Sequence, residues 1–291
     1  MTRLRDFAEL VRAPAALSVP GDVVAGAAAA GTLSPRTAGL AGASICLYWA
    51  GMAANDWADR DLDAVERPER PIPSGRISAP AALGVAAGLT AAGVALAAVC
   101  GGRRALAVAA PLAAAVWAYD IKAKGTAVGP VTMAACRGLD VLLGASSGRP
   151  RAALPAALTV AAHTYTVTEL SRREVSGADR RLPAATLAGT AALAAVVARP
   201  PRRTGTRRGR WAQSVSAALT SQYAAQYGAA QVRAVADPSA ARIRSAVGTG
   251  ITGLPALQGA LAARAGAVLT GLTVAAAAPL GRLLSRRISA T

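Results

Sequence analysis

Four carboxylates stand close together at the end of an apolar run, in the segment Asn55-Asp56-Trp57-Ala58-Asp59-Arg60-Asp61-Leu62-Asp63. On a helix, Asp56, Asp59 and Asp63 share one face, and like charges at these spacings destabilise the helix. A positive group among them would remove this repulsion. Mg²⁺ is the hard cation that carboxylates hold together with substrate phosphates. The pattern therefore favours Mg²⁺ binding by Asp56, Asp59 and Asp63, and the alternative is a solvated acidic loop.

A basic, proline-rich segment follows at once, with the sequence Glu66-Arg-Pro-Glu-Arg-Pro-Ile-Pro-Ser-Gly-Arg76. An acidic cluster followed by a basic loop indicates a site for a metal-bound diphosphate. In such a site Asn55 would serve as an oxygen ligand or as a hydrogen-bond donor to phosphate. Asp61 points elsewhere on a helix and is a spare carboxylate.

The composition indicates a membrane protein. The chain has 291 residues, of which 53% are hydrophobic, and a mean hydropathy of +0.37. Its apolar runs repeatedly reach the length that crosses a bilayer, about 18 residues or more. They are rich in Ala and Gly, which let helices approach closely in lipid. The net charge of +17 lies mainly between these runs, where it anchors and orients a membrane protein, so we expect no nucleic-acid partner.

The pattern of apolar runs predicts an all-α, polytopic membrane bundle of nine or ten spans, forming a single domain over residues 1–291. A short amphipathic helix at 1–13 precedes the spans, and a long polar loop covers 56–77. The predicted spans are 15–33, 37–54, 78–100, 105–119, 127–146, 152–170, 182–198, 213–235, 246–263 and 266–285.

The distribution of Lys and Arg predicts the orientation in the cell membrane. Basic residues are more frequent in the loops that share a side with the N-terminus, which favours a cytoplasmic N-terminus. The acidic motif, the loop with Lys122 and the Glu169–Glu174 loop then all lie on the cytoplasmic face. The basic linker 199–210 falls on the other side and argues against this topology.

These motifs resemble those of the UbiA superfamily of intramembrane prenyltransferases. Asn55–Asp63 is similar to the first aspartate-rich motif of that family, and Arg67–Arg76 to the basic run after it. Tyr119-Asp120-Ile121-Lys122 resembles its Tyr-Pro-x-x-Lys segment, and Gln231-x-Arg233 with Asp237-Pro238 also fits. Within the superfamily, Arg137-Gly-Leu-Asp140 and Thr168–Glu174 look most similar to the bacterial EboC-like branch.

The resemblance implies a helical bundle around a central chamber and a reaction inside it. A polyprenyl diphosphate enters from the bilayer, and Mg²⁺ on two acidic motifs binds its diphosphate. Ionisation gives an allylic carbocation, which a small acceptor captures. Carboxylates hold the metal, cationic side chains neutralise the leaving group, and a dry chamber keeps water away. Lys122 is the expected catalytic cation, and Arg76, Tyr119, Asp140 and Arg172 are expected to bind substrate.

The second acidic motif departs from the family pattern. The region offers only Glu169 and Glu174, which we assign to metal binding. Their five-residue separation places them about 140° apart on a helix, so both face one cavity only if the helix ends between them. Otherwise Glu169 alone replaces the motif, and Arg172 or Arg173 supplies a fixed positive charge in place of a second ion.

Polar groups inside predicted spans are costly and usually mark a site. Asp22 would hydrogen-bond or activate the acceptor, or cap a break in the helix. Arg137 would contact diphosphate or hold an acidic acceptor, and the alternative is an ion pair with Asp140, three residues later. The lone histidine, His163, is expected to be a hydrogen-bonded packing residue.

Two other functions fit the same sequence features. One is transfer of a phosphorylated pentose to a polyprenyl phosphate, which related family members carry out. The other is a non-catalytic lipid-binding or export component that keeps the chamber and has lost the second acidic motif.

Overall fold

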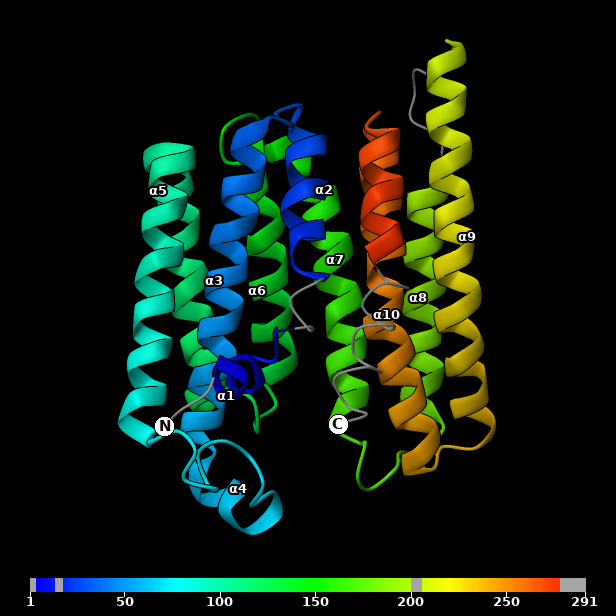
Figure 1. Ribbon diagram of the computed structural model, residues 1–291. Helices are drawn as coiled ribbons and strands as arrows, with labels where there is room; N and C mark the ends of the chain where they lie inside the picture. Colours follow the sequence, from blue (N-terminus) through cyan, green and yellow to red (C-terminus); the bar gives the residue numbers. More distant parts are fainter. Residues whose placement is uncertain (1–3, 14–17, 200–205, 278–291) are drawn as a thin grey trace.

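The computed structural model describes residues 4–13, 18–199 and 206–277, which contain only helices and turns. The helices form an upright bundle, with the shorter α1 and α4 at its lower end (Figure 1). In chain order they are α1 (Leu4–Leu10), α2 (Pro20–Ala30), α3 (Pro35–Ala58), α4 (Arg60–Glu66), α5 (Ala79–Ala118), the π-helical turn η2 (Tyr119–Ala123), α6 (Gly129–Gly144), α7 (Pro150–Ser171), α8 (Arg181–Ala198), α9 (Arg207–Ala236) and α10 (Ala240–Arg264). The prediction of an all-α fold is confirmed.

Local sequence signals explain several helix boundaries. α3 begins with a capping box, in which the side chains of Ser34 and Thr37 each accept a backbone N–H, and Pro35 occupies the first turn.

α5 covers both spans predicted at 78–100 and 105–119, because the chain bends at Gly102, where φ is +66°. The two halves of α5 lie side by side, and Trp117 donates a hydrogen bond to Thr90 over 3.0 Å.

Close packing of α2 against α6 depends on two glycines. A Cβ on Gly26 would clash with the carbonyl oxygen of Val141, and one on Gly144 with that of Val23. This close approach brings the first turn of α2 next to the middle of α6. Two large apolar clusters surround the pair, one formed mainly by α3, α5 and α6 and the other by α7, α9 and α10.

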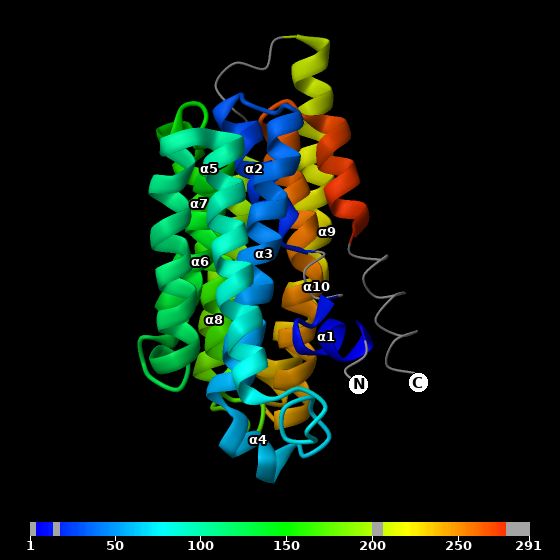
Figure 2. The ribbon, with the colours of Figure 1, turned by 60° about the vertical axis from the view of Figure 1, so that its left-hand side comes forward.

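The polar connections gather at one end of the bundle. α4, the loop after α7 and the turn between α9 and α10 all lie at the lower end in Figure 1. α1 lies across this end beside the segment that follows α4 (Figure 2). The loop predicted at 56–77 is wrong in part, because its first half is helical: α3 continues to Ala58 and α4 follows.

Three of the described helices are long and apolar enough to cross a bilayer: Pro35–Ala58, Ala79–Ala123 and Arg181–Ala198. Since α5 folds back on itself, its two halves correspond to two of the predicted spans. The last predicted span, 266–285, is helical at Val268–Ala277, and the rest of it lies outside the described residues. The first, 15–33, is helical over α2, and residues 15–17 are likewise outside. The total of nine or ten spans stays a prediction.

Candidate active site

The acidic motif is folded so that two of its carboxylates meet. Asp56 lies in the last turns of α3 and Asp63 in α4, and both are buried. They share one cationic nitrogen, Nη1 of Arg70, which lies 2.6 Å from Oδ2 of Asp63 and 3.4 Å from Oδ1 of Asp56. Asp61 instead is 87% exposed at its side chain and pairs with Arg60. The helical turn thus separates the converging carboxylates from the spare one.

Two further cations reach this motif from distant parts of the chain. Nη2 of Arg12, just after α1, donates to Oδ1 of Asp56 over 2.7 Å. Arg12 has a φ of +46°, a left-handed conformation that is uncommon outside glycine. Nζ of Lys124 lies 2.6 Å from Oδ1 of Asp59. Every carboxylate predicted to bind metal in the first motif therefore has a cationic partner.

The structure places Lys124, rather than Lys122, beside the acidic motif. Lys122 is exposed, whereas Lys124 is partly buried against Asp59. The reason is the π-helical turn η2, in which the Lys124 N–H bonds the Tyr119 carbonyl, five residues back. This wider turn changes which residue faces α3, and an ordinary α-helical spacing does not predict it.

Arg76 also lies apart from the acidic motif. Its guanidinium binds α1 instead, at 2.8 Å from Oδ1 of Asp6 and 2.7 Å from Oε2 of Glu9. The hydrogen bond from Arg76 lowers the pKa of the Glu9 carboxyl below its usual value. Arg70 takes the position expected of Arg76, because Ile72 and Ile77 fold the proline-rich segment against the bundle and turn Arg76 toward α1.

A buried carboxylate that the sequence analysis missed connects the motif to the interior. Asn55 donates through Nδ2 to Oδ1 of Asp120 over 3.3 Å, and Asp120 is 3% exposed. Asp120 and Tyr119 both line a cavity between α3, α5 and α6. The sequence does contain a signal for this site: Asp120 is a charged residue between two apolar segments.

The donor set of the first motif fits one divalent cation. Asp56 and Asp63 already converge on a single cationic nitrogen, so their oxygens point at a common centre, and hard oxygen donors suit Mg²⁺. Across the described ranges, no three His, Cys, Asp or Glu side chains form a group that could hold a metal without help. Mg²⁺ is commonly held by one or two carboxylates together with substrate phosphates. Two carboxylates are what this site offers.

The second acidic region has a different arrangement. Glu169 lies near the end of α7, and its Oε2 atom is 3.8 Å from Nη1 of Arg172, the first residue after the helix. Glu174 lies beyond the helix end, in the loop, where burial raises its pKa. Glu169 and Arg172 line a polar cleft with Asp179 and Ser239, and Glu174 does not belong to its lining residues. The helix ends between the two glutamates, but they are not brought into one cavity.

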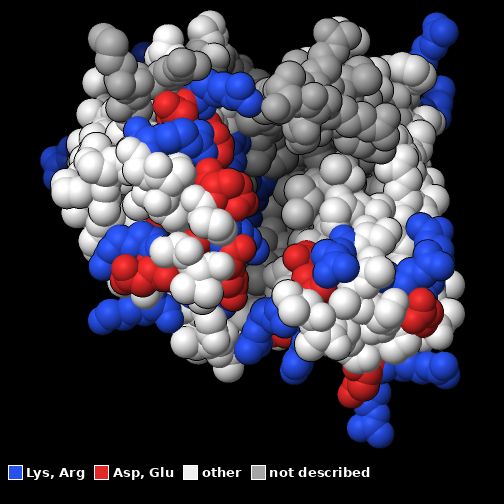
Figure 3. Space-filling model, turned by 60° about the horizontal axis from the view of Figure 1, so that its bottom comes forward, with Lys and Arg blue, Asp and Glu red and all other residues white. Residues whose placement is uncertain are grey.

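Charged side chains cover the lower end of the molecule unevenly. In Figure 3 acidic and basic side chains alternate on one side of this face, and the face is hollowed near its centre. The acidic motif contributes the pairs of Asp56 and Asp63 with Arg12 and Arg70. The α7–α8 and α9–α10 connections contribute the pairs Arg172–Glu169 and Arg242–Asp237.

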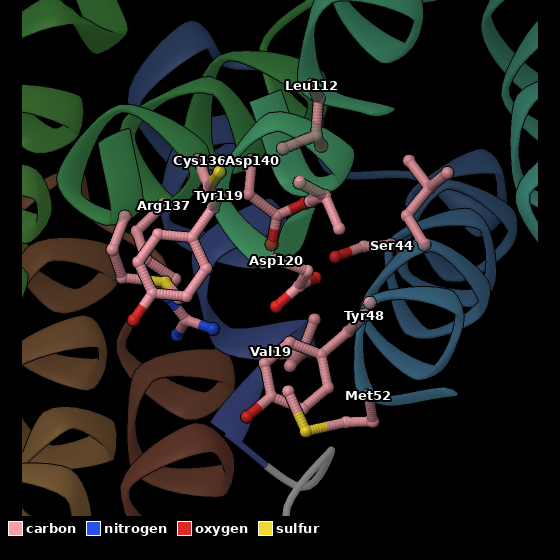
Figure 4. A pocket seen from close by; sticks show the side chains of 14 residues that line it. Val19, Ser44, Tyr48, Met52, Leu112, Tyr119, Asp120, Cys136, Arg137 and Asp140 are labelled. Atoms are coloured by element: carbon pink, nitrogen blue, oxygen red, sulfur yellow. The ribbon is translucent and has the colours of Figure 1, made fainter. Parts of the chain in front are cut away.

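The intramembrane charges predicted on α2 and α6 are brought together. Nε of Arg137 lies 2.7 Å from Oδ2 of Asp22, and Nε2 of Gln258, on α10, donates to Oδ1 of Asp22 over 2.6 Å. The alternative pair of Arg137 with Asp140 is absent from the ion pairs of the described residues. Asp140 lies in the cavity wall with Arg137, Ser44 and Tyr48 (Figure 4).

Comparison with known proteins shows which protein family the sequence matches. Residues 18–198 match a family described as the UbiA prenyltransferase family. A digeranylgeranylglyceryl phosphate synthase from Methanopyrus kandleri is 39% identical over 154 residues, which are 50% of this chain and 54% of that protein. The chain thus aligns with about half the length of this curated relative.

Solved structures show the same fold. A digeranylgeranylglyceryl phosphate synthase structure aligns with a TM-score of 0.68 and 16% identity, over 92% of this chain and 100% of the other. A UbiA homolog from Archaeoglobus fulgidus bound to GPP and Mg²⁺ aligns with a TM-score of 0.57 and 13% identity, over 84% of this chain and 99% of the other. These identities support the fold alone.

Proposed function

Because this chain belongs to the UbiA prenyltransferase family, we propose that it transfers an isoprenyl group within the membrane. The donor is a polyprenyl diphosphate, the cofactor is Mg²⁺, and the acceptor is a small molecule. The relatives whose names include geranylgeranyl products, and the homolog bound to GPP and Mg²⁺, support a prenyl diphosphate donor.

The observation that carries this proposal is the convergence of Asp56 and Asp63 on one cationic centre. The buried carboxylates of this site are suited to bind the metal ion, and the guanidinium groups that balance them are suited to bind the diphosphate. Asp56 and Asp63 would hold Mg²⁺, and Arg70 and Arg12 would then be available to bind the phosphate oxygens. Each cation would keep an anionic partner, so no buried charge would be left unpaired.

The side chains around the motif each have a place in this reaction. Lys124 and Arg70 neutralise the charge that develops on the leaving diphosphate. Bound Mg²⁺ supplies Lewis-acid stabilisation of the same oxygens. Asn55 orients Asp120 in the wall of the cavity, and apolar side chains from α3, α5 and α6 exclude water from the allylic end of the donor.

The positions of the polar connections and of the basic residues also suggest where the protein is located and how it is oriented in the membrane. We propose a multi-pass protein of the cell membrane that forms a single domain over residues 1–291, with the lower end in the cytoplasm. The excess of Lys and Arg in the loops on the N-terminal side supports this orientation. Water-soluble Mg²⁺ and diphosphate can then reach and leave the acidic motif from the cytoplasm.

The test is a release assay with matched variants. Protein in nanodiscs receives Mg²⁺, labelled prenyl diphosphates of several lengths and a cell extract as acceptor source, and released diphosphate is measured. We expect Asp56→Ala and Asp63→Ala to lose at least about 100-fold in kcat/KM, as expected for groups that hold a catalytic metal. Asp61→Ala, an exposed carboxylate of the same motif, is expected to stay near wild type.

Two results would refute the proposal. One is the absence of release from any prenyl donor, and the other is equal activity of the Asp56, Asp63 and Asp61 variants. Binding of a prenyl diphosphate without turnover would favour the non-catalytic alternative, which the reduced second acidic region also fits. Release from a phosphorylated sugar diphosphate alone would favour pentosyl transfer.

A further inference from the structure

The wall of the cavity between α3, α5 and α6 holds a few polar groups in an otherwise apolar lining. Val19, Leu47 and Leu112 are among its apolar residues. Ser44 and Asp140 contribute the polar atoms farther from the acidic motif, and Asp120 lies nearer to it. In Figure 4 the side chains of Asp140, Asp120 and Ser44 surround one space. A substrate that fills this space meets carboxylates in a mainly apolar surrounding.

The one positive charge in this lining is already balanced. Arg137 is paired with Asp22 at 2.7 Å and donates through Nη2 to the Ser18 carbonyl over 3.4 Å. Gln258 fixes Asp22 from the other side. If Arg137 turned to another anion, the buried Asp22 carboxylate would keep only its hydrogen bond from Gln258, and an unpaired buried charge is costly.

Asp140, by contrast, has an unused acceptor. The Ser44 hydroxyl donates one hydrogen bond to its carboxylate. Its Oδ1 atom is buried and has no hydrogen-bond partner among the described residues, and the residue is 4% exposed. A buried carboxylate oxygen without a donor costs about 1–3 kcal/mol or more. A ligand that donates a hydrogen bond at this point would remove that cost.

The formal charges around the space favour the same kind of ligand. Asp140 and Asp120 line the space, and the guanidinium in the same lining, that of Arg137, is already paired with Asp22. An acceptor with a phosphate or carboxylate group would place its negative charge beside these two carboxyl groups in a low-dielectric site, where like charges repel strongly. A neutral hydroxyl group meets an acceptor atom that needs a proton.

We propose that Asp140 and Ser44 form the acceptor subsite, and that the acceptor is a neutral, lipid-soluble alcohol whose hydroxyl donates to Asp140. This inference rests on the proposed prenyl transfer. In the transfer, the bond between C1 of the prenyl group and the diphosphate oxygen breaks, and its electron pair leaves with the diphosphate. The hydroxyl oxygen forms the new bond to C1, and its proton passes to the Asp140 carboxylate.

The test compares two probes with the same alkyl chain and glycerol backbone, one neutral and one with a phosphate group: hexadecylglycerol and hexadecylglycerol phosphate. Binding of each probe to the protein in nanodiscs is measured, followed by prenylation of each probe with Mg²⁺ and labelled geranylgeranyl diphosphate. We expect the wild type to bind and prenylate the neutral probe at least about 10-fold better than the phosphate, which corresponds to about 1.4 kcal/mol.

The variants assign this preference to Asp140. Asp140→Asn keeps the shape of the side chain, and we expect it to lower kcat/KM for the neutral probe at least about 100-fold while the KM for the prenyl donor is unchanged. Asp22→Asn releases Arg137, and we expect it to shift the preference toward the phosphate probe. Asp61→Asn is the control. Ser44→Ala is the second variant if Asp140→Asn lowers the melting temperature, and it is expected to lower the same kcat/KM about 10-fold.

The outcomes separate this inference from the proposed function. Equal or better use of the phosphate probe by wild type would overturn the neutral acceptor. Unchanged use of the neutral probe by Asp140→Asn and Ser44→Ala would overturn the subsite. Failure of the proposed function has its own signature, because Mg²⁺-dependent binding of the prenyl diphosphate, measured without acceptor, would then be absent from wild type.

Discussion

The two halves of this bundle hold their polar residues in different ways. In the α3–α6 half, charged side chains from three segments of the chain meet: Arg12, Arg70 and Lys124 each contact a carboxylate of the acidic motif. In the α7–α10 half, the buried polar groups are neutral. His163 shares a hydrogen bond of 2.9 Å with Tyr223, whose ring packs at a tilt against that of Tyr227.

This difference shows which half is built to exchange partners. Ion pairs that join distant segments can be replaced by a metal ion and a diphosphate with the charges still balanced. We call His163, Tyr223 and Tyr227 the neutral network. Its uncharged, packed rings have no ion pair that a metal or diphosphate could replace, so it stabilises helix packing instead. Activity is therefore expected to depend on the first half, whereas substitutions in the neutral network should change stability.

The largest expected effect concerns the two neighbouring lysines. Lys124→Ala removes the cation beside Asp59, and we expect kcat/KM to fall about 100-fold, in the range for loss of one group that stabilises developing charge. Lys122→Ala, the exposed matched control, should stay within about twofold of wild type. Steady-state kinetics with the prenyl diphosphate check both. Equal losses would contradict the assignment of Lys124.

A smaller effect is expected at the second acidic region. Because Glu169 has Arg172 as its nearest cation and lies apart from Glu174, Glu169→Gln should lower kcat/KM by less than about fivefold. Asp63→Asn is the comparison and should lose at least about 100-fold. The Mg²⁺ concentration for half-maximal activity gives the second readout. A large increase in this concentration for Glu169→Gln would show a second metal site after all.

In the neutral network, a change in stability without a change in activity is expected. Tyr223→Phe removes the hydroxyl that contacts Nδ1 of His163, and this should lower the free energy of unfolding by about 1 kcal/mol, the usual value for one hydrogen bond. Thermal unfolding in detergent measures it, with the partly exposed Tyr165→Phe as control. A loss of activity larger than the loss of folded protein would place the network in catalysis.

The smallest effect concerns the contact of α1 with Arg76. Since the pKa of Glu9 is lowered in the folded protein, its contact contributes stability above its unfolded pKa, near 4.5, and this stability is lost as the pH falls below that value. The pair is partly exposed, so the contribution should stay below about 1 kcal/mol. The hydrogen-exchange protection factor of residues 4–10, which corrects for the slower intrinsic exchange at low pH, should decrease between pH 5 and 3. Arg76→Gln should remove this pH dependence, and an unchanged dependence would exclude the pair as its cause.

Part of the site could be predicted from local spacing. Asp56 and Asp63 were expected on one side of a helical segment and are found converging, and Asp61 was expected to point away and is exposed. Predictions that needed a partner from another helix were less complete. Arg137 was weighed between diphosphate, an acidic acceptor and Asp140, and its partner is Asp22 on α2.

The sequence by itself determined the helical membrane character, the acidic motif at a helix end and the family, because these depend on apolar periodicity and on residues close together in the chain. Only the tertiary structure decided which cation faces which carboxylate. Lys124 replaces Lys122 because a π-helical turn shifts the facing position, and Arg70 replaces Arg76 because the proline-rich segment folds back on α1. Partners between helices depend on how closely the backbones pack, and contacts such as that of Gly26 with Val141 set that distance.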